Sequence, residues 1–526
     1  MKDGYELPAG WTTALIEEVI APQFDGKTLH QGWSPQCEKV RCVTPEEWGV
    51  LKTTAIQAGE FQPEHHKRLP QHLEPRPAIE VNEGDLLLTC AGPRIRCGVA
   101  CLVRSTRPRL MLSGKMYRFR AIPKATDARY LESFLQTDAA QTAIDRMKTG
   151  GNESGLNLTH DRFKQLQVRI APYAEQIRIV EKLEELLSDL DAGVAELKAA
   201  QRKLTQYRQS LLKAAVEGAL TADWRAARAQ SGDPQETGAA LLQRILTERR
   251  TRWEARQLAM FAEQGKMPPK DWRAKYPEPV APDTADLRAL PDGWVWATLS
   301  QVGWLDRGRS THRPRNAPHL YGGAYPFVQT GDIREADTFI REASASYSDA
   351  GLAQSRLWPI DTIVITIAAN IGKTALLAME ACFPDSVVGF LPATDHVSIR
   401  FVEYFMRTAQ QKLESEAPAT AQKNINLEIL ERVCLPLPPL QEQLQIVSVV
   451  SDALDATREQ DAAIELALKQ SAAQRKNILK AAFAGQLVPQ DPNDEPASVL
   501  LERIRAGRAM NGAPGKKRGC TTRTCA

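Results

Sequence analysis

The sequence predicts two mixed α/β (α+β) globular domains that are joined by two long antiparallel coiled-coil helices and related by an internal duplication. Three observations predict this fold class. Four stretches of the first half recur in the same order in the second half. A leucine repeat with a period of seven follows the first globular part, and short apolar runs alternate with helical patterns inside both globular parts. At 526 residues the chain is also too long for one hydrophobic core.

The duplication is visible as aligned segments. Residues 7–11 (Leu-Pro-Ala-Gly-Trp) recur at 290–294, an offset of 283. Residues 175–220 align without a gap on 442–487, an offset of 267. Residues 241–245 recur at 500–504, an offset of 259. Because the offsets fall steadily and the order is kept, chance similarity is excluded and the second half is slightly shorter.

The two globular parts show short apolar runs between helical patterns. Runs at 86–88 and 363–367 each lead to a glycine turn and predict buried strands. The stretches 128–148 and 398–414 predict helices. Each globular part is therefore expected to be a mixed α/β domain.

The long segments 175–220 and 442–487 contain no proline, so each predicts one unbroken helix. Their apolar residues follow a heptad pattern, which predicts a helix–helix seam. The seam residues are Val180, Leu183, Leu187, Leu190, Val194, Leu197, Leu204 and Leu211 in the first helix, and Val447, Val450, Leu454, Ile464, Leu468 and Ile478 in the second. Asp461 and Ser471 also fall on the second seam, where polar residues favour one register. We expect the helices to pack antiparallel, with a globular domain at each end.

These patterns predict six regions. They are a first globular domain (1–173), a central helical region (174–267) with a shorter second helix at about 239–261, a proline-rich extended linker (268–290), a second globular domain (291–439), a C-terminal helical region (440–510) and a disordered basic tail (511–526).

Basic residues cluster in both globular parts. Between Asp85 and Asp127 nine basic residues occur and no acidic one. Such a run is typical of phosphate contact and of arginine reading guanine edges, although a charge run is also often only a solvated face. The candidate DNA-binding residues are Arg94, Arg96, Arg104, Arg107, Arg109, Lys115 and Arg118 in the first part, and Arg307, Arg309, Arg313 and Arg315 in the second.

Catalytic and metal-binding patterns are missing from the sequence. Residues 371–374 (Ile-Gly-Lys-Thr) lack the first glycine of a phosphate-binding loop, and no dinucleotide-type glycine motif or clustered nuclease carboxylates occur. Nine cysteines without a Cys-x-x-Cys pair indicate reduced thiols rather than a zinc site or a disulfide framework. We therefore predict no catalytic residue, no metal and no cofactor. The sequence has no signal peptide and no run of about 18 apolar residues, which predicts a cytoplasmic protein.

Three features together resemble the specificity (S) subunit of a Type I restriction-modification system. They are the paired Leu-Pro-x-Gly-Trp starts, the segment 436–443 (Pro-Leu-Pro-Pro-Leu-Gln-Glu-Gln), and the matching helix ends Leu-Lys-Ala-Ala-x-x-Gly-x-Leu at 212–220 and 479–487. The resemblance covers nearly the whole chain. It departs at 170–176, where the first copy lacks the double proline.

The resemblance implies a non-catalytic subunit with two target recognition domains, each of which reads half of a bipartite, asymmetric double-stranded DNA site. It implies that the long helices dock two methylation (M) subunits, with two restriction (R) subunits completing the complex. S-adenosylmethionine, Mg²⁺ and ATP would belong to those partners. Two alternatives remain open from the residues alone: a structural coiled-coil adaptor without DNA contact, and an enzyme with unrecognised motifs.

Overall fold

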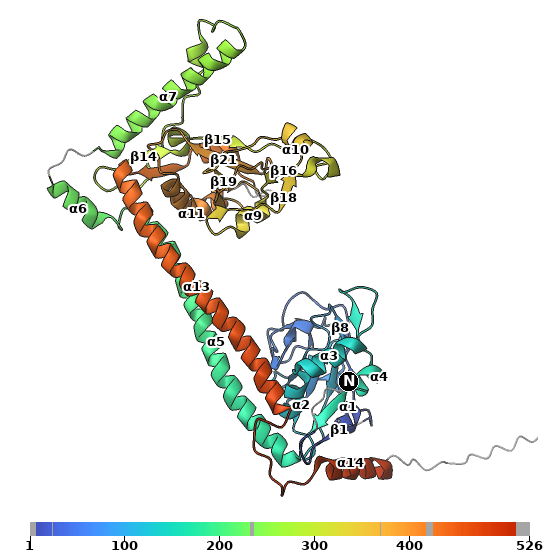
Figure 1. Cartoon of the computed structure of the whole chain (residues 1–526). Helices are drawn as coiled ribbons and strands as arrows, with labels where there is room; N and C mark the ends of the chain where they lie inside the picture. The colour runs from blue at the N-terminus through green and yellow to red at the C-terminus, as the bar shows by residue number, and fades with distance from the viewer. Residues whose placement is uncertain (1–6, 24, 232–235, 369, 417–423, 512–526) are drawn as a thin grey trace, which may run out of the picture. The chain divides into compact units, whose positions relative to one another are not determined.

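The protein is described by a computed structural model that covers residues 7–23, 25–231, 236–368, 370–416 and 424–511. The chain divides into two compact units. Unit 1 comprises Met1–Lys198 and Glu465–Ala526, and unit 2 comprises Ala199–Ile464. Each unit contains a globular part and one segment of each long helix (Figure 1). None of the described helices has the length and apolar character needed to cross a membrane.

Unit 1 contains short strands, four short helices and a C-terminal helix around the first long helix. The strands are β1 (Thr12–Leu15), β2 (His30–Gln31), β3 (Gly49–Leu51), β4 (Ile56–Gln57), β5 (Glu60–Phe61), β6 (His66–Arg68), β7 (Leu86–Thr89), β8 (Ala91–Gly92), β9 (Ala100–Leu102), β10 (Leu110–Met111), β11 (Met116–Phe119), β12 (Leu156–Asn157) and β13 (Gln167–Ile170). The helices are α1 (Ile16–Val19), α2 (Ala128–Leu135), α3 (Asp138–Met147), α4 (His160–Lys164), α5 (Tyr173–Val216) and α14 (Ala497–Asn511), with 3₁₀ turns η1 (Thr53–Ala55) and η2 (Pro77–Ile79).

Unit 2 repeats this order with a larger sheet. Its strands are β14 (Val295–Thr298), β15 (Gly303–Arg307), β16 (Tyr321–Phe327), β17 (Phe339–Ile340), β18 (Ala345–Tyr347), β19 (Ile363–Thr366), β20 (Thr374–Leu377), β21 (Val387–Pro392) and β22 (Cys434–Leu437). Its helices are α6 (Ala222–Gln230), α7 (Gly238–Glu263), α8 (Leu299–Val302), α9 (Thr330–Glu335), α10 (Asp349–Ala353), α11 (Ile399–Glu416), α12 (Leu427–Glu431) and α13 (Leu440–Ala482), with 3₁₀ turns η3 (Trp272–Lys275) and η4 (Pro318–Leu320).

The central sheets of the two units share one topology. Unit 1 has the order β2-β11-β7-β9 and unit 2 has β15-β21-β19-β20-β17. In each sheet the predicted apolar run, β7 or β19, is a fully buried strand paired antiparallel on both sides. A separate antiparallel pair, β1–β13 or β14–β22, joins the first and last strands of each globular part. The structure is thus mixed α/β, as the sequence predicts.

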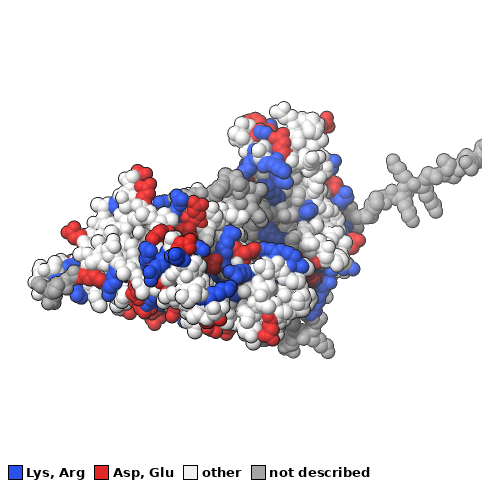
Figure 2. Space-filling model, turned by 90° about the horizontal axis from the view of Figure 1, so that it is seen from above, with Lys and Arg blue, Asp and Glu red and all other residues white. Residues whose placement is uncertain are grey.

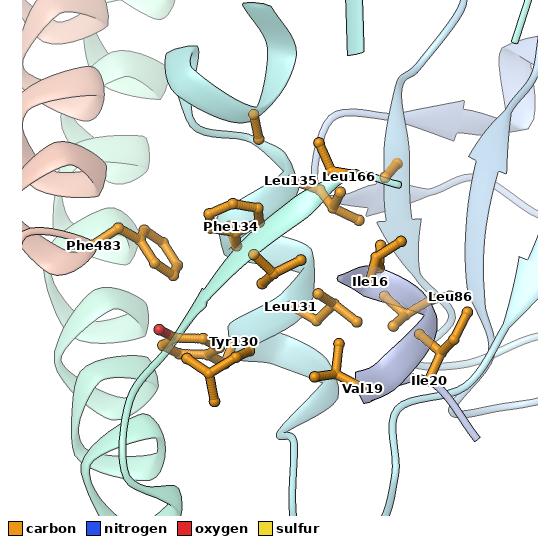
Figure 3. Close-up of a cluster of buried hydrophobic side chains, with 14 of the residues drawn as sticks. Ile16, Val19, Ile20, Leu86, Tyr130, Leu131, Phe134, Leu135, Leu166 and Phe483 are labelled. Carbon is orange, nitrogen blue, oxygen red and sulfur yellow. The ribbon is translucent and has the colours of Figure 1, made fainter. Parts of the chain in front are cut away.

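The core of unit 1 lies between its central sheet, α1, α2 and the ends of the long helices. Ile16, Leu86 and Leu131 are fully buried there, and Figure 3 shows them facing one another. Phe483, one residue beyond α13, points into the same core and packs on Tyr130 with ring centroids 4.9 Å apart (Figure 3). Residues about 350 positions apart along the chain thus share one core.

The long helices α5 and α13 each run without interruption, and their segments lie side by side within each unit (Figure 1). In unit 2 Arg208 pairs with Asp461, whereas the later residue Val216 clusters with the earlier residue Val450. The numbering therefore rises along one segment as it falls along the other, so the segments are antiparallel. In unit 1 Asp191 pairs with Arg475.

The predicted seam residues face inward to different degrees. Val180, Leu183, Leu211, Val450, Leu454 and Ile478 are buried, and Leu187, Leu190, Val194, Leu197, Leu204, Val447, Ile464 and Leu468 are half-buried. The most buried residues lie toward the helix ends, where the globular parts cover the pair. A coiled coil that joins two domains stays a prediction.

Two predicted segments differ from the structure. The helix expected over 128–148 is two helices, because Thr137 ends α2 and caps α3, accepting a hydrogen bond from Ala140 N at 3.2 Å. The segment 268–290, expected to be an extended linker, packs against α7 through buried Trp272 and Tyr276. Aromatic burial outweighs the extended preference of the prolines there. The predicted disordered tail, 511–526, lies outside the described residues apart from its first residue.

Candidate nucleic-acid interface

A buried hydrogen bond, the Trp–Glu clamp, ties the start of each globular part to a long helix. In unit 1 Trp11 Nε1 donates to both carboxylate oxygens of Glu175 at 3.1 Å, and burial raises the pKa of Glu175. Gln176 Oε1 accepts from Asp127 N at 3.0 Å, and its Nε2 donates to Ala171 O at 2.9 Å. Since buried polar groups need such partners, these bonds fix the first turn of α5 on the globular part.

The same clamp occurs in unit 2. Trp294 Nε1 donates to Glu442 Oε2 at 2.9 Å. Gln443 Oε1 accepts from Ser398 N at 2.8 Å, and its Nε2 donates to Pro438 O at 3.0 Å. The repeated Leu-Pro-x-Gly-Trp and Glu-Gln motifs of the sequence are therefore the two halves of one structural joint.

Each unit is completed by the segment that follows the long helix of the other repeat. After α13, Ala497 N donates to Gly10 O at 2.8 Å in unit 1. After α5, Gly238 N donates to Gly293 O at 2.6 Å in unit 2. The frame that carries each globular part therefore contains parts of both repeats.

A buried glutamate links a helix to the central sheet in both units. Glu132 of α2 accepts from Leu102 N at 2.6 Å and pairs with Arg104 at 2.7 Å. Glu403 of α11 accepts from Thr374 Oγ1 of β20 at 3.4 Å and pairs with Arg407 of its own helix at 2.5 Å. Burial raises the pKa of both carboxyl groups. Sequence reasoning missed this pair; the signal was an acidic residue on an otherwise apolar helix face in both copies.

A turn closed by the same two hydrogen bonds follows the central buried strand of each unit, although the turn of unit 1 is three residues longer. In unit 1 Thr89 O accepts from Gly98 N at 2.7 Å, and Thr89 Oγ1 accepts from Val99 N at 3.0 Å. In unit 2 the corresponding bonds join Thr366 O to Gly372 N at 2.8 Å, and Thr366 Oγ1 to Lys373 N at 3.1 Å. We call these the strand-end turns.

Different side chains occupy the two strand-end turns. The turn of unit 1 carries Arg94, Arg96 and Ile95, whose side chain is 85% exposed. The turn of unit 2 carries an exposed Lys373. The backbone frame is repeated and its exposed side chains are not, so each turn displays a distinct chemical surface.

Three of the candidate arginines of unit 1 are already paired within the domain. Arg94 binds Asp145 at 2.6 Å and Glu153 at 2.7 Å, and these acids raise its pKa. Arg96 donates to Gln57 Oε1 at 3.0 Å and to the Ile56 carbonyl at 2.8 Å. Arg104 pairs with buried Glu132, as described above. These pairings supply stability to the domain and reduce the charge available to DNA.

One candidate does not fit a DNA contact. The Arg118 side chain is 5% exposed, donates to the Ala78 carbonyl at 3.1 Å and to Gln23 Oε1 at 2.9 Å, and burial lowers its pKa. Arg107 is half-buried and Arg109 is exposed, and both donate to backbone carbonyls of the neighbouring loop. Lys115 is exposed. Arg107, Arg109 and Lys115 are therefore the best-placed candidates of unit 1.

The four candidates of unit 2 lie at and beyond the end of β15. Arg315 pairs with Asp385 at 2.7 Å, and Arg313 donates to the Ser310 carbonyl at 2.7 Å. Arg307 and Arg309 are exposed, and within the described residues their guanidinium groups have no hydrogen-bond or ion-pair partner. They are the two candidates of unit 2 best placed to meet phosphate or a base edge.

A further group of cations in unit 1 was missed by sequence reasoning. The loop 36–47 exposes Lys39 and Arg41. Burial, followed by the charges of Arg107, Arg41 and Lys52, lowers the pKa of His66, so these cations gather around one histidine. In the sequence, glutamates are interspersed among these cations, so they form no continuous stretch of positive charge.

The molecular surface carries its charges in a mixed pattern. Figure 2 shows lysine and arginine side chains in several groups interspersed with acidic side chains on the face that it draws. The sequence run without acids between Asp85 and Asp127 is therefore not a purely basic surface, because folding brings Glu80, Asp145 and Glu153 against its arginines.

The described cysteines are all free thiols, namely Cys37, Cys42, Cys90, Cys97, Cys101, Cys382 and Cys434. Burial raises the pKa of both Cys97 and Cys101. Within the described ranges, no group of three or more His, Cys, Asp or Glu side chains is arranged to hold a metal ion. Cys520 and Cys525 lie outside those ranges.

Comparison with known proteins finds similarity to specificity subunits of Type I restriction enzymes. A family model described as the Type I restriction modification DNA specificity domain matches residues 291–469. The EcoEI specificity subunit of Escherichia coli is 34% identical over 212 residues, which are 40% of this chain and 35% of that subunit. That alignment therefore spans about a third of the relative. The EcoKI specificity subunit of Escherichia coli K12 is 23% identical over 535 residues, covering 97% of this chain and 98% of that subunit.

A solved structure shares the fold. A chain from work on complex assembly and conformational transition of the type I R-M system superposes with a TM-score of 0.57 at 16% identity. The superposition covers 92% of this chain and 100% of that chain.

Proposed function

We propose that the chain is a Type I restriction enzyme specificity subunit and that it selects the DNA sequence on which a restriction-modification complex acts. The observation that carries the proposal is the match of residues 291–469 to a DNA specificity domain. The chain supplies recognition, and catalysis belongs to other subunits.

We propose further that the globular parts of units 1 and 2 are two recognition domains that read a bipartite target. The support is the repetition of the Trp–Glu clamp, the central strand order and the strand-end turn. Repeated DNA readers bind repeated half-sites at a spacing set by their frame. Because the exposed side chains of the two turns differ, the half-sites differ and the target is asymmetric.

Cations that are exposed, or half-buried in the case of Arg107, would hold the DNA. Arg107, Arg109 and Lys115 in unit 1, and Arg307 and Arg309 in unit 2, are the proposed contacts. Arginine and lysine contacts to phosphate position a domain, and contacts to base edges in the groove specify sequence. Arg94, Arg96 and Arg104 instead stabilise the unit 1 domain through the pairs described above.

The long helices are the proposed docking surface for two M subunits, with two R subunits completing the complex. Tyr207, Leu444 and Leu466 lie on these helices with exposed fractions of 50%, 49% and 56%. Exposed large apolar side chains are typical of protein interfaces. S-adenosylmethionine, Mg²⁺ and ATP would bind those partners, which would supply methyl transfer, cleavage and translocation.

A binding experiment tests the function. The full chain, assembled with the M subunits of its host, is titrated with a pool of random-sequence duplexes, and the bound DNA is sequenced. Enrichment of a motif with two defined parts is expected. Bound DNA without any enriched motif would contradict the proposal.

A further inference from the structure

The far part of α7 and the segment that folds back on it form a basic arm, residues 250–275. The arm contains seven lysine and arginine residues and three acidic residues, a net charge of +4. The whole chain has a net charge of +3, so the rest of the chain is slightly acidic. The net positive charge of the chain therefore comes from the arm.

The arm is held in a defined position on unit 2. Trp253 of α7 stacks on Trp272 with ring centroids 5.9 Å apart and meets Tyr276 at 5.4 Å. At its base the Arg249 guanidinium lies 3.6 Å from the Trp304 ring of β15 and donates to Tyr276 Oη at 2.6 Å. Aromatic and cation–π packing of this kind fixes the direction of a projection that would otherwise be mobile.

Four of the seven cations of the arm are exposed and have no acidic partner among the described residues, whereas Arg252 pairs with Glu248 at 2.6 Å and with Asp395 at 3.0 Å. Arg250 and Arg273 both pair with Glu254. Arg256, Lys266, Lys270 and Lys275 are exposed, and within the described part of the chain none of these four pairs with an acidic side chain. Figure 1 shows the far end of α7 standing clear of the unit 2 sheet, so it faces the viewer in Figure 2.

The equivalent helix of the other repeat uses its arginines differently. In α14 Arg503 pairs with Glu495 at 2.9 Å, Arg505 pairs with Glu18 at 2.7 Å, and Arg508 donates to the Ile20 carbonyl at 2.6 Å. These cations fasten α14 to unit 1. By the 259-residue offset of the duplication, these arginines correspond to residues 244–249, which precede the arm, and the counterparts of the arm beyond residue 252 lie outside the described residues.

We propose that the arm contacts the sugar–phosphate backbone of double-stranded DNA outside the bases that the recognition domains read. This inference rests on the proposed function. Three of the four cations are lysines, whose single point charges suit phosphate and not the bidentate reading of a base. The contact adds affinity without sequence preference, because phosphates are the same at every position.

The test is the salt dependence of DNA binding by the full chain assembled with its M subunits. The variant carries Arg256→Gln, Lys266→Gln, Lys270→Gln and Lys275→Gln together. A plot of the logarithm of the binding constant against the logarithm of the salt concentration has a negative slope, and each lost phosphate contact makes that slope less steep by about 0.9. The slope of the variant should therefore be less steep than that of the wild type by about 2–4. The preferred sequence should be unchanged.

Two controls separate charge from structure. The charge-conserving variant, with Arg256→Lys, Lys266→Arg, Lys270→Arg and Lys275→Arg, should keep the wild-type slope. Arg334→Gln with Arg432→Gln removes exposed cations of unit 2 that lie outside the arm and outside the long helices, and should also leave the slope unchanged.

The outcomes distinguish the two proposals. A wild-type complex that prefers its target, together with a four-site variant of unchanged slope, overturns the arm contact alone. A wild-type complex without sequence preference overturns the proposed function instead. Leu258, Met260 and Met267 of the arm are exposed and offer a surface to a protein. Loss of M-subunit assembly in the four-site variant, with assembly kept in the charge-conserving variant, would assign the arm to that partner and contradict the inference.

Discussion

A buried indole nitrogen contributes one of the hydrogen bonds that hold each globular part to its long helix. Replacing Trp294 by Phe removes the donor to Glu442 and leaves a buried carboxylate short of one partner. The free energy of unfolding should fall by about 1–3 kcal/mol, measured by urea denaturation. Trp296→Phe is the matched control, because Trp296 is less buried and its Nε1 donates at 3.2 Å to the Arg288 carbonyl at the surface. Equal losses in both variants would contradict the role of the clamp.

The buried Glu403 carboxyl makes stability depend on pH. Its pKa is raised by burial above the ordinary value of 4.5, so the folded state holds the proton more tightly than the unfolded state. The stabilising contribution is complete below pH 4.5 and is lost as the pH rises through the folded pKa. Relative to wild type, Glu403→Gln should therefore gain unfolding free energy as the pH rises. A stability difference that stays constant from pH 4.5 to 8 would show that the carboxyl titrates normally.

At the scale of elements, glycine ends both long helices. Gly218 and Gly485 have φ of +76° and +69°, and a Cβ would lie 2.8 Å from Pro291 Cγ or 2.3 Å from Pro8 Cγ. Alanine at either position should destabilise by at least about 1–2 kcal/mol from the backbone conformation alone. Thermal unfolding of the full chain measures the effect.

Gly193 is the internal control for this prediction. It lies inside α5, its φ is not positive, and a Cβ would meet nothing within 4 Å. Gly193→Ala should therefore stabilise the helix by about 0.5–1 kcal/mol. Glycine-to-alanine substitution should thus raise the free energy of unfolding in the middle of α5 and lower it at the end of the helix. A change in the same direction at both positions would contradict this account of the helix ends.

At the scale of the molecule, the sequence predicted the repeated helices and strands better than it predicted the residues of the candidate DNA-binding surface. Heptad spacing and the absence of proline predicted α5 and α13 as unbroken helices, because helix periodicity is a local property. Apolar runs predicted β7 and β19 for the same reason. The break at Thr137 was missed, since one threonine cap inside a helical pattern is a weak signal.

The candidate site was predicted less well, because it depends on contacts between distant segments. The Arg94 charge is met by Glu153, 59 residues away, and Arg104 is met by Glu132. No spacing rule in one sequence reveals such pairs. Arg307 and Arg309 are exposed, and the nearby acids Asp385 and Asp306 pair with Arg315 and Arg356 instead.

The proposed DNA contacts predict that each unit reads only one half-site. Arg307→Gln with Arg309→Gln should relax the base preference in one half-site only, with a loss of about 1–3 kcal/mol of discrimination for each lost base contact. Sequencing of bound duplexes from a random pool measures it. Arg118→Gln should instead destabilise unit 1, because it removes donors from buried acceptors. A change in both half-sites from the first variant would contradict two independent reading domains.

The central claim is that one chain carries two recognition domains for a two-part target. Base-resolution mapping of methylated sites in cells that contain this chain and its M subunits tests it most directly. The account predicts one motif of two different short half-sites separated by a fixed number of unspecified base pairs. A single uninterrupted motif, or methylation without a motif, would contradict it.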